Sequence, residues 1–420
     1  MDQQKNWAGN LIYQAKHWYE PESVEQVQAI VQHASHVRVV GSRHSFNDIA
    51  DSNDTIISLA KLNQILTLDK DKRTVTIEGG VRYGELSSFL QEHGFALPNL
   101  ASLPHISVVG ACATATHGSG DRNPCLSSSV RAMKIVTANG EEVQFSREKQ
   151  GEEWNGAAVS LGALGVVTEM TLDVIPSFEV SQYVYEHLPF QQVEQHLDDI
   201  FSSAYSVSLF TDWKQDGFNK VWLKQLDAEF TPDQARPDIY GARPALANLH
   251  PLPGLEAIHC TEQMGVPGPW FDRLPHFRLD FTPSSGSELQ SEYLVPRQYA
   301  LEALKAVRNM RETLAPLLHA NEIRSIAKDT LWLSPCYQQD AIGIHLTWKD
   351  NWEAVQQVLP QLEAALEPFQ ARPHWGKVFM MPKERVQSFY EKLPEFRQLL
   401  EKYDPEGKFR NKFINTYIFG

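Results

Sequence analysis

The sequence predicts an α+β fold built as two domains. Up to about residue 177, helical and short strand-like patterns are mixed, which is typical of an α+β layer domain. From about residue 178 the pattern changes to alternating strands and a Pro-rich stretch. A chain of 420 residues is long enough for two sizeable cores. We therefore expect a first domain that ends near Ile175-Pro176 and a second domain after it.

The first part of the chain contains two predicted helices and five predicted strands. Pro21–Ala34 has an apolar face at helical spacing behind a capping box of Ser23 and Gln26. Tyr83–His93 is a second amphipathic helix. The strands are Val37–Val40, Thr55–Leu59, Thr74–Glu78, Arg131–Thr137 and Val166–Val174. We expect the last two strands to pair around the turn signal Asn139-Gly140.

The second part of the chain contains more strands than helices. Ser206–Trp213 and Lys220–Leu226 alternate polar and apolar residues around an Asp216-Gly217 turn. Residues 227–296 are Pro-rich and irregular, and they are too long for an ordinary connection. Arg297–Leu318 has helical spacing. Three short strand-like pieces follow, which are Glu322–Ala327, Gly343–Trp348 and His374–Phe379.

Composition and charge argue against several classes of function. The net charge of −14 disfavours binding to nucleic acid or to an anionic membrane. No apolar run approaches the roughly 20 residues that span a bilayer, and the first ten residues lack the features of a signal peptide. The four cysteines are scattered without disulfide or metal-binding spacing. We therefore expect a reduced, cytoplasmic protein without a metal site.

Several common catalytic motifs are absent from the sequence. It contains no GxxxxGK[ST] phosphate loop, no HExxH zinc motif and no GxSxG nucleophile elbow. The GALG run at residues 162–165 does not open a helix as a Rossmann fingerprint does. Nicotinamide chemistry is therefore disfavoured.

The stretch Ala101–Gly120, ASLPHISVVGACATATHGSG, is rich in Gly, Ala, Ser and Thr. Small side chains let the backbone approach a ligand closely and leave N–H and hydroxyl donors free, as in a loop that cradles a pyrophosphate. An ordinary buried crossing between strands has the same composition. Two further loops of this kind, residues 39–46 (VVGSRHSF) and 161–168 (LGALGVVT), favour the ligand-binding interpretation.

The three small-residue loops are similar to the flavin-binding half of the vanillyl-alcohol oxidase family. Asn6–Asn10 (NWAGN), the run SLPHIS, Glu322-Ile323-Arg324 and His374–Lys377 (HWGK) resemble the bacterial alditol oxidases of that family, over essentially the whole chain. The resemblance implies a two-domain FAD-binding fold of the vanillyl-alcohol oxidase (PCMH) type, with an α+β cap built on an antiparallel sheet. It implies an FAD-binding domain at residues 1–177, a substrate-binding cap at 178–377, and a segment at 378–420 that returns to the FAD domain.

His44 is the residue to which the resemblance assigns a covalent bond to FAD. A neutral imidazole nitrogen is nucleophilic near pH 7, which suits such an attachment. The alternative is a loop histidine that only hydrogen-bonds the backbone. The neighbouring Arg43 stands where the family often has glycine, and if this position needs a positive φ, Arg43 is strained by about 1 kcal/mol or more.

The resemblance also implies which other residues contact FAD. Ala115 stands where the family often has glycine, which suggests slightly less room at that contact. Val167 is expected to touch the adenine end through its backbone. For each residue the alternative is simple packing. The implied set is Val39, Val40, Gly41, Ser42, Arg43, His44 and Ser45 in the first loop, then Ser102, Ser107, Gly110, Thr114, Ala115, Thr116 and His117, and finally Val167.

Strand periodicity predicts one polar face for the substrate. Side chains two apart on a strand share a face, so Glu322 and Arg324 point one way, and His345 and Thr347 share a face on the next strand. In the third piece, Lys377 shares a face with Trp375. A solvated sheet face is the ordinary alternative. The family resemblance assigns catalysis to Arg324, Lys377 and His345, and substrate binding to Ser102, Glu322, Arg324 and Thr347.

The activity implied by the resemblance is oxidation of a terminal hydroxyl of a small alditol, such as xylitol or sorbitol, to the aldose. Molecular oxygen would regenerate the flavin and yield hydrogen peroxide. Two alternatives remain open at this point: a sugar-lactone oxidase or dehydrogenase, and a catalytically silent flavin-binding protein. We expect a monomer whose partners are the polyol and O2.

Overall fold

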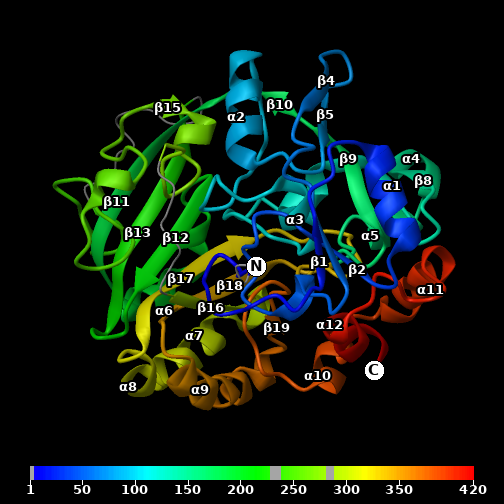
Figure 1. The fold of residues 1–420 in the computed structure, drawn as a ribbon. Coiled ribbons are helices and arrows are strands. Elements are labelled where there is room, and N and C mark those ends of the chain that lie inside the picture. The colour runs from blue at the N-terminus through cyan, green and yellow to red at the C-terminus, as the bar shows by residue number, and fades with distance from the viewer. Residues whose placement is uncertain (1–3, 228–237, 281–287) are drawn as a thin grey trace.

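The computed structural model describes residues 4–227, 238–280 and 288–420. Within these ranges the strands form four sheets, of which two are large (Figure 1). A three-stranded parallel sheet and a five-stranded antiparallel sheet come from residues before 177, and a nine-stranded sheet comes from residues 179–373. The fold is α+β, as the sequence predicts.

The three-stranded sheet has the order β1-β3-β2 and is parallel. Its strands are His17–Tyr19, Thr55–Ser58 and Val37–Val40. Helix α1 (Val24–His33) begins at the predicted cap, where the backbone N–H of Gln26 donates to Ser23 Oγ at 3.3 Å. Its buried Val27 and Val31 pack in a small core with this sheet. Strand β2 ends at the first small-residue loop.

The five-stranded sheet has the order β4-β5-β9-β7-β8. Its strands are Ile65–Asp69, Thr74–Glu78, Val166–Asp173, Val130–Val136 and Glu142–Ser146. β7 pairs with β9 as expected, but the turn at Asn139-Gly140 joins β7 to β8, a strand that the sequence analysis missed. The helices α2, α3, α4 and α5 are Tyr83–Glu92, Val108–Ala113, Arg147–Gln150 and Glu153–Ala157, and β6 (Phe95–Ala96) pairs with β10 (Ile175–Pro176).

The nine-stranded sheet has the order β14-β11-β13-β12-β17-β18-β16-β19, and β15 pairs with β11 beside this path. In that order its strands are Arg243–Pro244, Glu179–Pro189, Gly217–Leu226, Ser206–Thr211, Leu318–Ile326, Ala341–Lys349, Glu288–Pro296 and Arg372–Pro373, with β15 at Gly268–Pro269. Its helices α6, α7, α8 and α9 are Phe190–Phe201, Ala300–Asn309, Arg311–Leu314 and Trp352–Ala365. Figure 1 shows α7, α8 and α9 together below β16, β17 and β18, and α3 above these strands.

Three expectations for the second part of the chain are wrong. The predicted helix 297–318 is interrupted at Met310 and ends at Leu314, two residues before Pro316, which lacks the N–H that a continuing helix needs. Residues 374–379 form a turn after β19 instead of a strand. The stretch 227–296, expected to be irregular, contains the nine-residue strand β16, although residues 228–237 and 281–287 lie outside the described residues.

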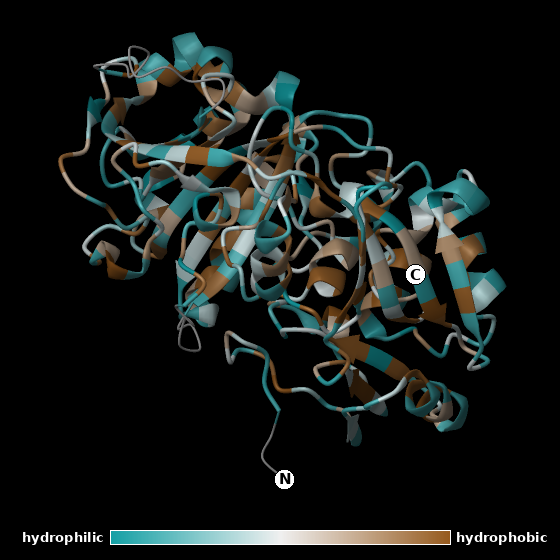
Figure 2. Cartoon of the chain, turned by 90° about the horizontal axis from the view of Figure 1, so that it is seen from above, coloured by the Kyte–Doolittle hydropathy of each residue, from teal (hydrophilic) through white to brown (hydrophobic). Residues whose placement is uncertain are grey.

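The C-terminal segment returns to the parallel sheet. Helices α10 (Lys383–Ser388), α11 (Leu393–Tyr403) and α12 (Lys412–Ile414) lie beside β1 and β2 in Figure 1. Figure 2 shows hydrophobic residues on the strands and inner helices and hydrophilic residues on the outer helices and loops. Among the described helices none is long and apolar enough to cross a membrane.

Arg38 ties four segments of this region together. Its side chain is buried on β2, and Nη1 donates to the carbonyls of Gly162 and Phe409 at 2.9 and 2.8 Å. Nη2 donates to the carbonyls of Ile49 and Leu161, each at 2.6 Å. Burial lowers the pKa of Arg38 to about 10, so the guanidinium stays charged at neutral pH. Four buried carbonyls therefore accept from one planar cation.

We expect Arg38→Met to lower the free energy of unfolding by about 3 kcal/mol or more, because it removes the donor of the Leu161, Gly162 and Phe409 carbonyls. The Ile49 carbonyl still accepts from Asn411 Nδ2. Arg38→Lys keeps the charge but not the planar guanidinium, so its free energy of unfolding should lie between those of wild type and Arg38→Met. Urea unfolding followed by tryptophan fluorescence measures the change. The matched control is Arg131→Met, which breaks half-exposed ion pairs with Glu148 and Asp173 and costs less than about 1 kcal/mol. Equal midpoints for Arg38→Met and Arg131→Met would contradict the role of Arg38.

Candidate active site

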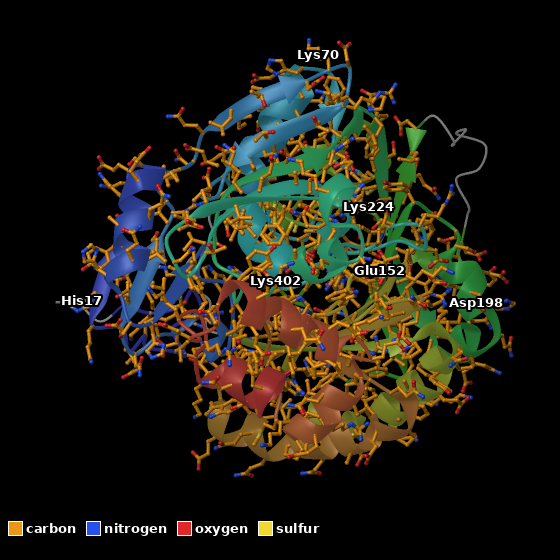
Figure 3. All side chains as sticks on the ribbon, turned by 90° about the vertical axis from the view of Figure 1, so that its right-hand side faces the viewer. His17, Lys70, Glu152, Asp198, Lys224 and Lys402 are labelled. Carbon is orange, nitrogen blue, oxygen red and sulfur yellow. The ribbon has the colours of Figure 1, made fainter. Side chains whose placement is uncertain are left out.

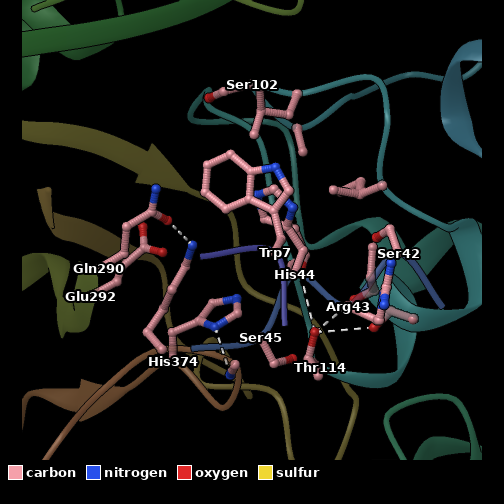
Figure 4. Close-up of a pocket in the computed structure, with 18 of the residues that line it drawn as sticks. Trp7, Ser42, Arg43, His44, Ser45, Ser102, Thr114, Gln290, Glu292 and His374 are labelled. Carbon is pink, nitrogen blue, oxygen red and sulfur yellow. Dashed lines mark hydrogen bonds between the residues drawn. The ribbon is translucent and has the colours of Figure 1, made fainter. Parts of the chain in front are cut away.

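A cavity of about 320 Å³ lies between the small-residue loops and the centre of the nine-stranded sheet. Its wall includes residues 39–45, parts of 101–117, Leu161 and Gly162, side chains of β16, β17 and β18, and the turn at 374–377. Figure 4 shows Ser42 and Arg43 on one side of Trp7 and His44, and Gln290, Glu292 and His374 on the other. The cavity therefore joins the first loop to the sheet.

The structure gathers nearly all of the sequence-predicted residues at this cavity. Val39 to Ser45, Ser102, Ser107, Gly110, Thr114, Thr116 and His117 line it, as do Glu322, Arg324, His345, Thr347 and Lys377. Ala115 and Val167 are not part of its wall within the described chain. The contacts of all these residues with a cofactor or substrate stay predictions.

Two glycines of the small-residue loops allow close packing against Ser107. A Cβ on Gly41 would lie 1.9 Å from Ser107 Oγ, and a Cβ on Gly110 would lie 2.6 Å from the same atom. The two loops also touch directly, since the N–H of Ser107 donates to Ser42 Oγ at 3.3 Å. Closely packed small residues that line a cavity fit a group such as FAD, which needs backbone donors near its phosphates.

Arg43 and Ala115 both have left-handed backbone conformations. Their φ angles are +58° and +54°, a region that costs a residue with a Cβ about 1–2 kcal/mol. The sequence analysis expected strain at Arg43 if its φ is positive, and the φ of Arg43 is positive. The positive φ of Ala115 is a conformation that glycine adopts without this cost, a feature that the sequence analysis did not expect at this position.

The imidazole of His44 is held face to face with an indole. The ring centroids of Trp7 and His44 are 4.2 Å apart at 29°, and Phe46 meets His44 edge-on at 6.2 Å. Burial, with Lys377 and His105 nearby, lowers the pKa of His44 to about 3, so the ring is neutral at physiological pH. Its Nε2 atom is buried without a hydrogen-bond partner among the described residues. A fixed, neutral, unpartnered imidazole fits the proposed attachment of FAD.

Three adjacent strands place a row of ionisable groups across the sheet. Glu322 of β17 lies opposite His345 of β18, and His345 lies opposite Glu292 of β16. Gln290 lies opposite Thr347 in the next row. Gln290 and Glu292 were missed because β16 fell in the stretch that was taken as irregular. The alternation of Glu288, Gln290 and Glu292 with apolar or small residues is the signal that could have found them.

Glu292 is the centre of this polar cluster. Its Oε1 accepts from Arg324 Nη2 at 2.7 Å and lies 3.2 Å from His117 Nε2, while its Oε2 lies 3.4 Å from His345 Nδ1. Burial alone raises the pKa of Glu292, but attraction to His117, Arg324 and His345 outweighs it and holds the pKa well below its usual range. Burial lowers the pKa of His345 and exceeds the opposing effect of Glu292.

Lys377 reaches the cluster from the turn after β19. Its Nζ donates to Gln290 Oε1 and lies 4.9 Å from the centre of the Phe46 ring. Desolvation lowers the pKa of Lys377 to about 8, with Glu292 acting in the opposite direction. Trp375 does not share its face: it is buried, and its Nε1 donates to the carbonyl of Leu333 at 2.7 Å. The strand-based pairing of Lys377 with Trp375 is therefore wrong, although Lys377 does line the cavity.

Arg324 and Glu322 keep unused hydrogen-bonding capacity. Arg324 Nε is buried and has no hydrogen-bond partner within the described chain, and it lies 3.7 Å from Glu322 Oε2. Glu322 Oε1 lies 2.9 Å from His276 Nε2, a contact that the sequence analysis did not predict. The site thus combines cations, carboxylates, neutral imidazoles and hydroxyls around one space.

Comparison with known proteins identifies the class. Residues 15–146 match the FAD binding domain family, and residues 283–417 match the D-arabinono-1,4-lactone oxidase family. The chain is 47% identical over 418 residues to an alditol oxidase of Streptomyces sp. (strain IKD472 / FERM P-14339), with 99% of each chain covered. It is 25% identical to the L-gulonolactone oxidase of Mus musculus, over 99% of this chain and 98% of the other. The crystal structure of cholesterol oxidase from B. sterolicum has a similar fold, with a TM-score of 0.78 at 14% identity over 99% of this chain and 96% of that one.

The alditol oxidase relative and the matched FAD binding domain together define an FAD-dependent oxidoreductase. Within that class, the chain belongs to the alditol oxidase family.

Proposed function

We propose that this protein oxidises a terminal primary hydroxyl of small alditols such as xylitol and sorbitol to the aldose, and reduces O2 to hydrogen peroxide. The 47% identity to an alditol oxidase supports the reaction. The observation that carries the substrate class is the polar row of β16, β17 and β18, where both donors and acceptors face one cavity. An uncharged, hydroxyl-rich chain needs such alternation rather than a single counter-ion.

FAD, when bound, would accept a hydride from the carbinol carbon and pass the electrons to O2. The chain's own contribution is to hold the hydroxyl and stabilise charge. His345 is neutral and would accept the hydroxyl proton, while Glu292 keeps its ring oriented. Arg324 and Lys377 are fixed cations that would stabilise negative charge as it develops. Ser102, Glu322 and Thr347 would bind the remaining hydroxyls.

We also propose the domain division given above, with an FAD-binding domain at 1–177, a cap at 178–377 and a returning segment at 378–420. The separation of the sheets near residue 177 supports it. A monomer that works in the cytoplasm is the accompanying proposal, and the four free, buried cysteines Cys112, Cys125, Cys260 and Cys336 fit a reducing compartment. A sugar-lactone oxidase is the second candidate, because residues 283–417 match the D-arabinono-1,4-lactone oxidase family.

We expect FAD to be bound covalently through His44. Acid-precipitated protein should stay yellow, and a flavin-bearing peptide from a digest should contain His44. His44→Ala should release its flavin on precipitation and oxidise substrate more slowly, whereas His105→Ala, a change in another histidine near the same cavity, should keep it. Complete release of the flavin from precipitated wild type would contradict the attachment.

Removal of a fixed cation should slow flavin reduction by about a hundredfold, since one preorganised donor is worth about 3 kcal/mol. Lys377→Met and Arg324→Ala should lower the reduction rate more than they weaken substrate binding, as measured by stopped-flow. Because the pKa of Lys377 is about 8, the wild-type reduction rate should also fall above that pH as the ammonium loses its proton. The reduction rate of Lys377→Met should not show this fall at high pH. The half-exposed Lys383→Met is the control. Unchanged flavin reduction rates in both Lys377→Met and Arg324→Ala would contradict the assignment of Lys377 and Arg324 as cations that stabilise the developing charge.

The reaction itself is tested by a turnover panel under air with peroxide assay and product identification. Xylitol and sorbitol should exceed glycerol in kcat/KM. A simple n-alkanol should be poorer by a factor on the order of 10⁴, because it leaves buried polar groups of the site unpaired. Equal or better turnover of a sugar lactone would favour the second candidate. Flavin reduction without peroxide would indicate a dehydrogenase.

A further inference from the structure

A buried lysine of the nine-stranded sheet lies behind the substrate side of the cavity. Figure 3 labels Lys224 together with Lys70 and Asp198, of which the last two lie at the outline of the molecule. Lys224 is on β13 and is 2% exposed. A buried ammonium is costly unless all its donors are used, so the partners of Lys224 show what it does.

The partners of Lys224 belong to one segment of the cavity wall. Its Nζ donates to the carbonyls of Leu274 and Pro275 and lies 3.4 Å from Nδ1 of His276. The backbone N–H of His276 donates to the carbonyl of Ser102 at 3.1 Å. Lys224 therefore holds the segment that connects the nine-stranded sheet to the small-residue loop.

His276 is enclosed on its faces and connected at both ring nitrogens. Trp222 and Phe210 meet the ring edge-on, with centroids 5.0 and 5.5 Å away. Nδ1 faces the ammonium of Lys224, and Nε2 lies 2.9 Å from Glu322 Oε1. Burial and the charge of Lys224 lower the pKa of His276 to about 4, so the ring is neutral at neutral pH.

These contacts fix the tautomer of His276. Burial lowers the pKa of Lys224 to about 7, and below that pH its ammonium can only donate. The Glu322 carboxylate can only accept from Nε2, so Nδ1 is the accepting nitrogen of the neutral ring. The ring proton then sits on Nε2 and is donated to Glu322 Oε1. This leaves Glu322 Oε2, on the side of Arg324, free to accept from a ligand.

We infer that Lys224 and His276 are positioning residues for Glu322: Lys224 sets the tautomer of His276, and His276 holds the Glu322 carboxylate in the orientation that accepts a substrate hydroxyl. The inference rests on the proposed function, since it takes that hydroxyl to be a polyol's. Neither residue needs to touch the reacting carbon. A lysine and a histidine of the cap thereby act on substrate affinity through a third side chain.

The first test compares two replacements of His276 in the FAD-bound enzyme. His276→Phe keeps the ring volume and removes the donor, and it should raise KM for xylitol at least tenfold with a smaller change in kcat. His276→Gln retains an N–H near the position of Nε2 and should stay within about threefold of wild type. An equal rise in KM in His276→Gln and His276→Phe would show a purely structural role and overturn the inference.

The second test asks whether His276 acts through Glu322. On a Glu322→Gln background, His276→Phe should change kcat/KM less than twofold further, because the group it positions has already been altered. A residue that only supports the fold would lower kcat/KM by the same factor in both backgrounds. That multiplicative result would overturn the proposal.

The third test does not use activity. In the FAD-bound enzyme labelled with ¹⁵N-histidine, the His276 signals, assigned by their loss in His276→Gln, should report a neutral ring protonated at Nε2. Lys224→Met should shift these signals toward a mixture of tautomers. Lys220→Met is the matched control, because Lys220 is also buried on β13 but its Nζ donates to the carbonyls of His250 and Pro251. It should leave the His276 signals unchanged.

The outcomes separate the inference from the proposed function. If wild type oxidises no alditol, the proposed function fails, while the ¹⁵N signals still decide the Lys224–His276 contact. Two results would overturn the inference even if xylitol is a good substrate. The first is a His276 ring protonated at Nδ1 in wild type, and the second is a set of His276 signals that does not change in Lys224→Met.

Discussion

The buried carboxylate of Glu292 is the constraint on which the site depends. It lies on β16, and its three partners come from β17, β18 and the small-residue stretch, through Arg324, His345 and His117. Its backbone carbonyl also accepts from the N–H of His374 at 2.9 Å, which holds the turn that carries Lys377. A buried charge of this kind is tolerated only with well-placed partners, and loss of one partner leaves an uncompensated charge. The Glu292 side chain thus links four segments, which are β16, β17, β18 and the small-residue stretch Ala101–Gly120.

The sheet makes room for this cluster with a glycine. Gly343 lies opposite Arg324 in the pairing of β17 with β18. A Cβ at this position would lie 3.1 Å from Glu292 Oε1, which is tighter than an ordinary contact, and 3.4 Å from His117 Cε1. Glycine weakens a strand interior, and here it allows a close ion pair above the sheet. The glycine that permits this charge arrangement therefore also weakens β18 locally.

The sequence predicted the parts of the site that follow from local periodicity. Glu322, Arg324, His345 and Thr347 lie on regular strands, where a period of two decides which face a side chain takes. Lys377 follows no such rule, because its position comes from a turn fixed by contacts with β16. β16 itself follows a Pro-rich stretch whose composition hid its alternation. Contacts that depend on the tertiary fold, such as His276 with Glu322, leave no pattern in the sequence at all.

The same distinction applies to the rest of the fold. The helix α1 and its Ser23 cap were predictable because capping is local. The pairing of β7 with β8 was not, because the turn at Asn139-Gly140 says only that a hairpin forms and not which later strand completes it. The left-handed conformation of Ala115 was invisible too, since alanine gives no local reason for it.

The closure of the parallel sheet by the C-terminal segment has a consequence for the order of synthesis. The backbone N–H of Val37 donates to the carbonyl of Lys408, and the side-chain amide of Asn411 donates to the carbonyls of Asp48, Ile49 and Asp51. The strands that a ribosome produces first therefore lack these partners until almost the whole chain has emerged. The nine-stranded sheet, made of residues 179–373, has all its strands earlier. All residues of the nine-stranded sheet are accordingly synthesised before the residues that bind Val37 and the segment 48–51.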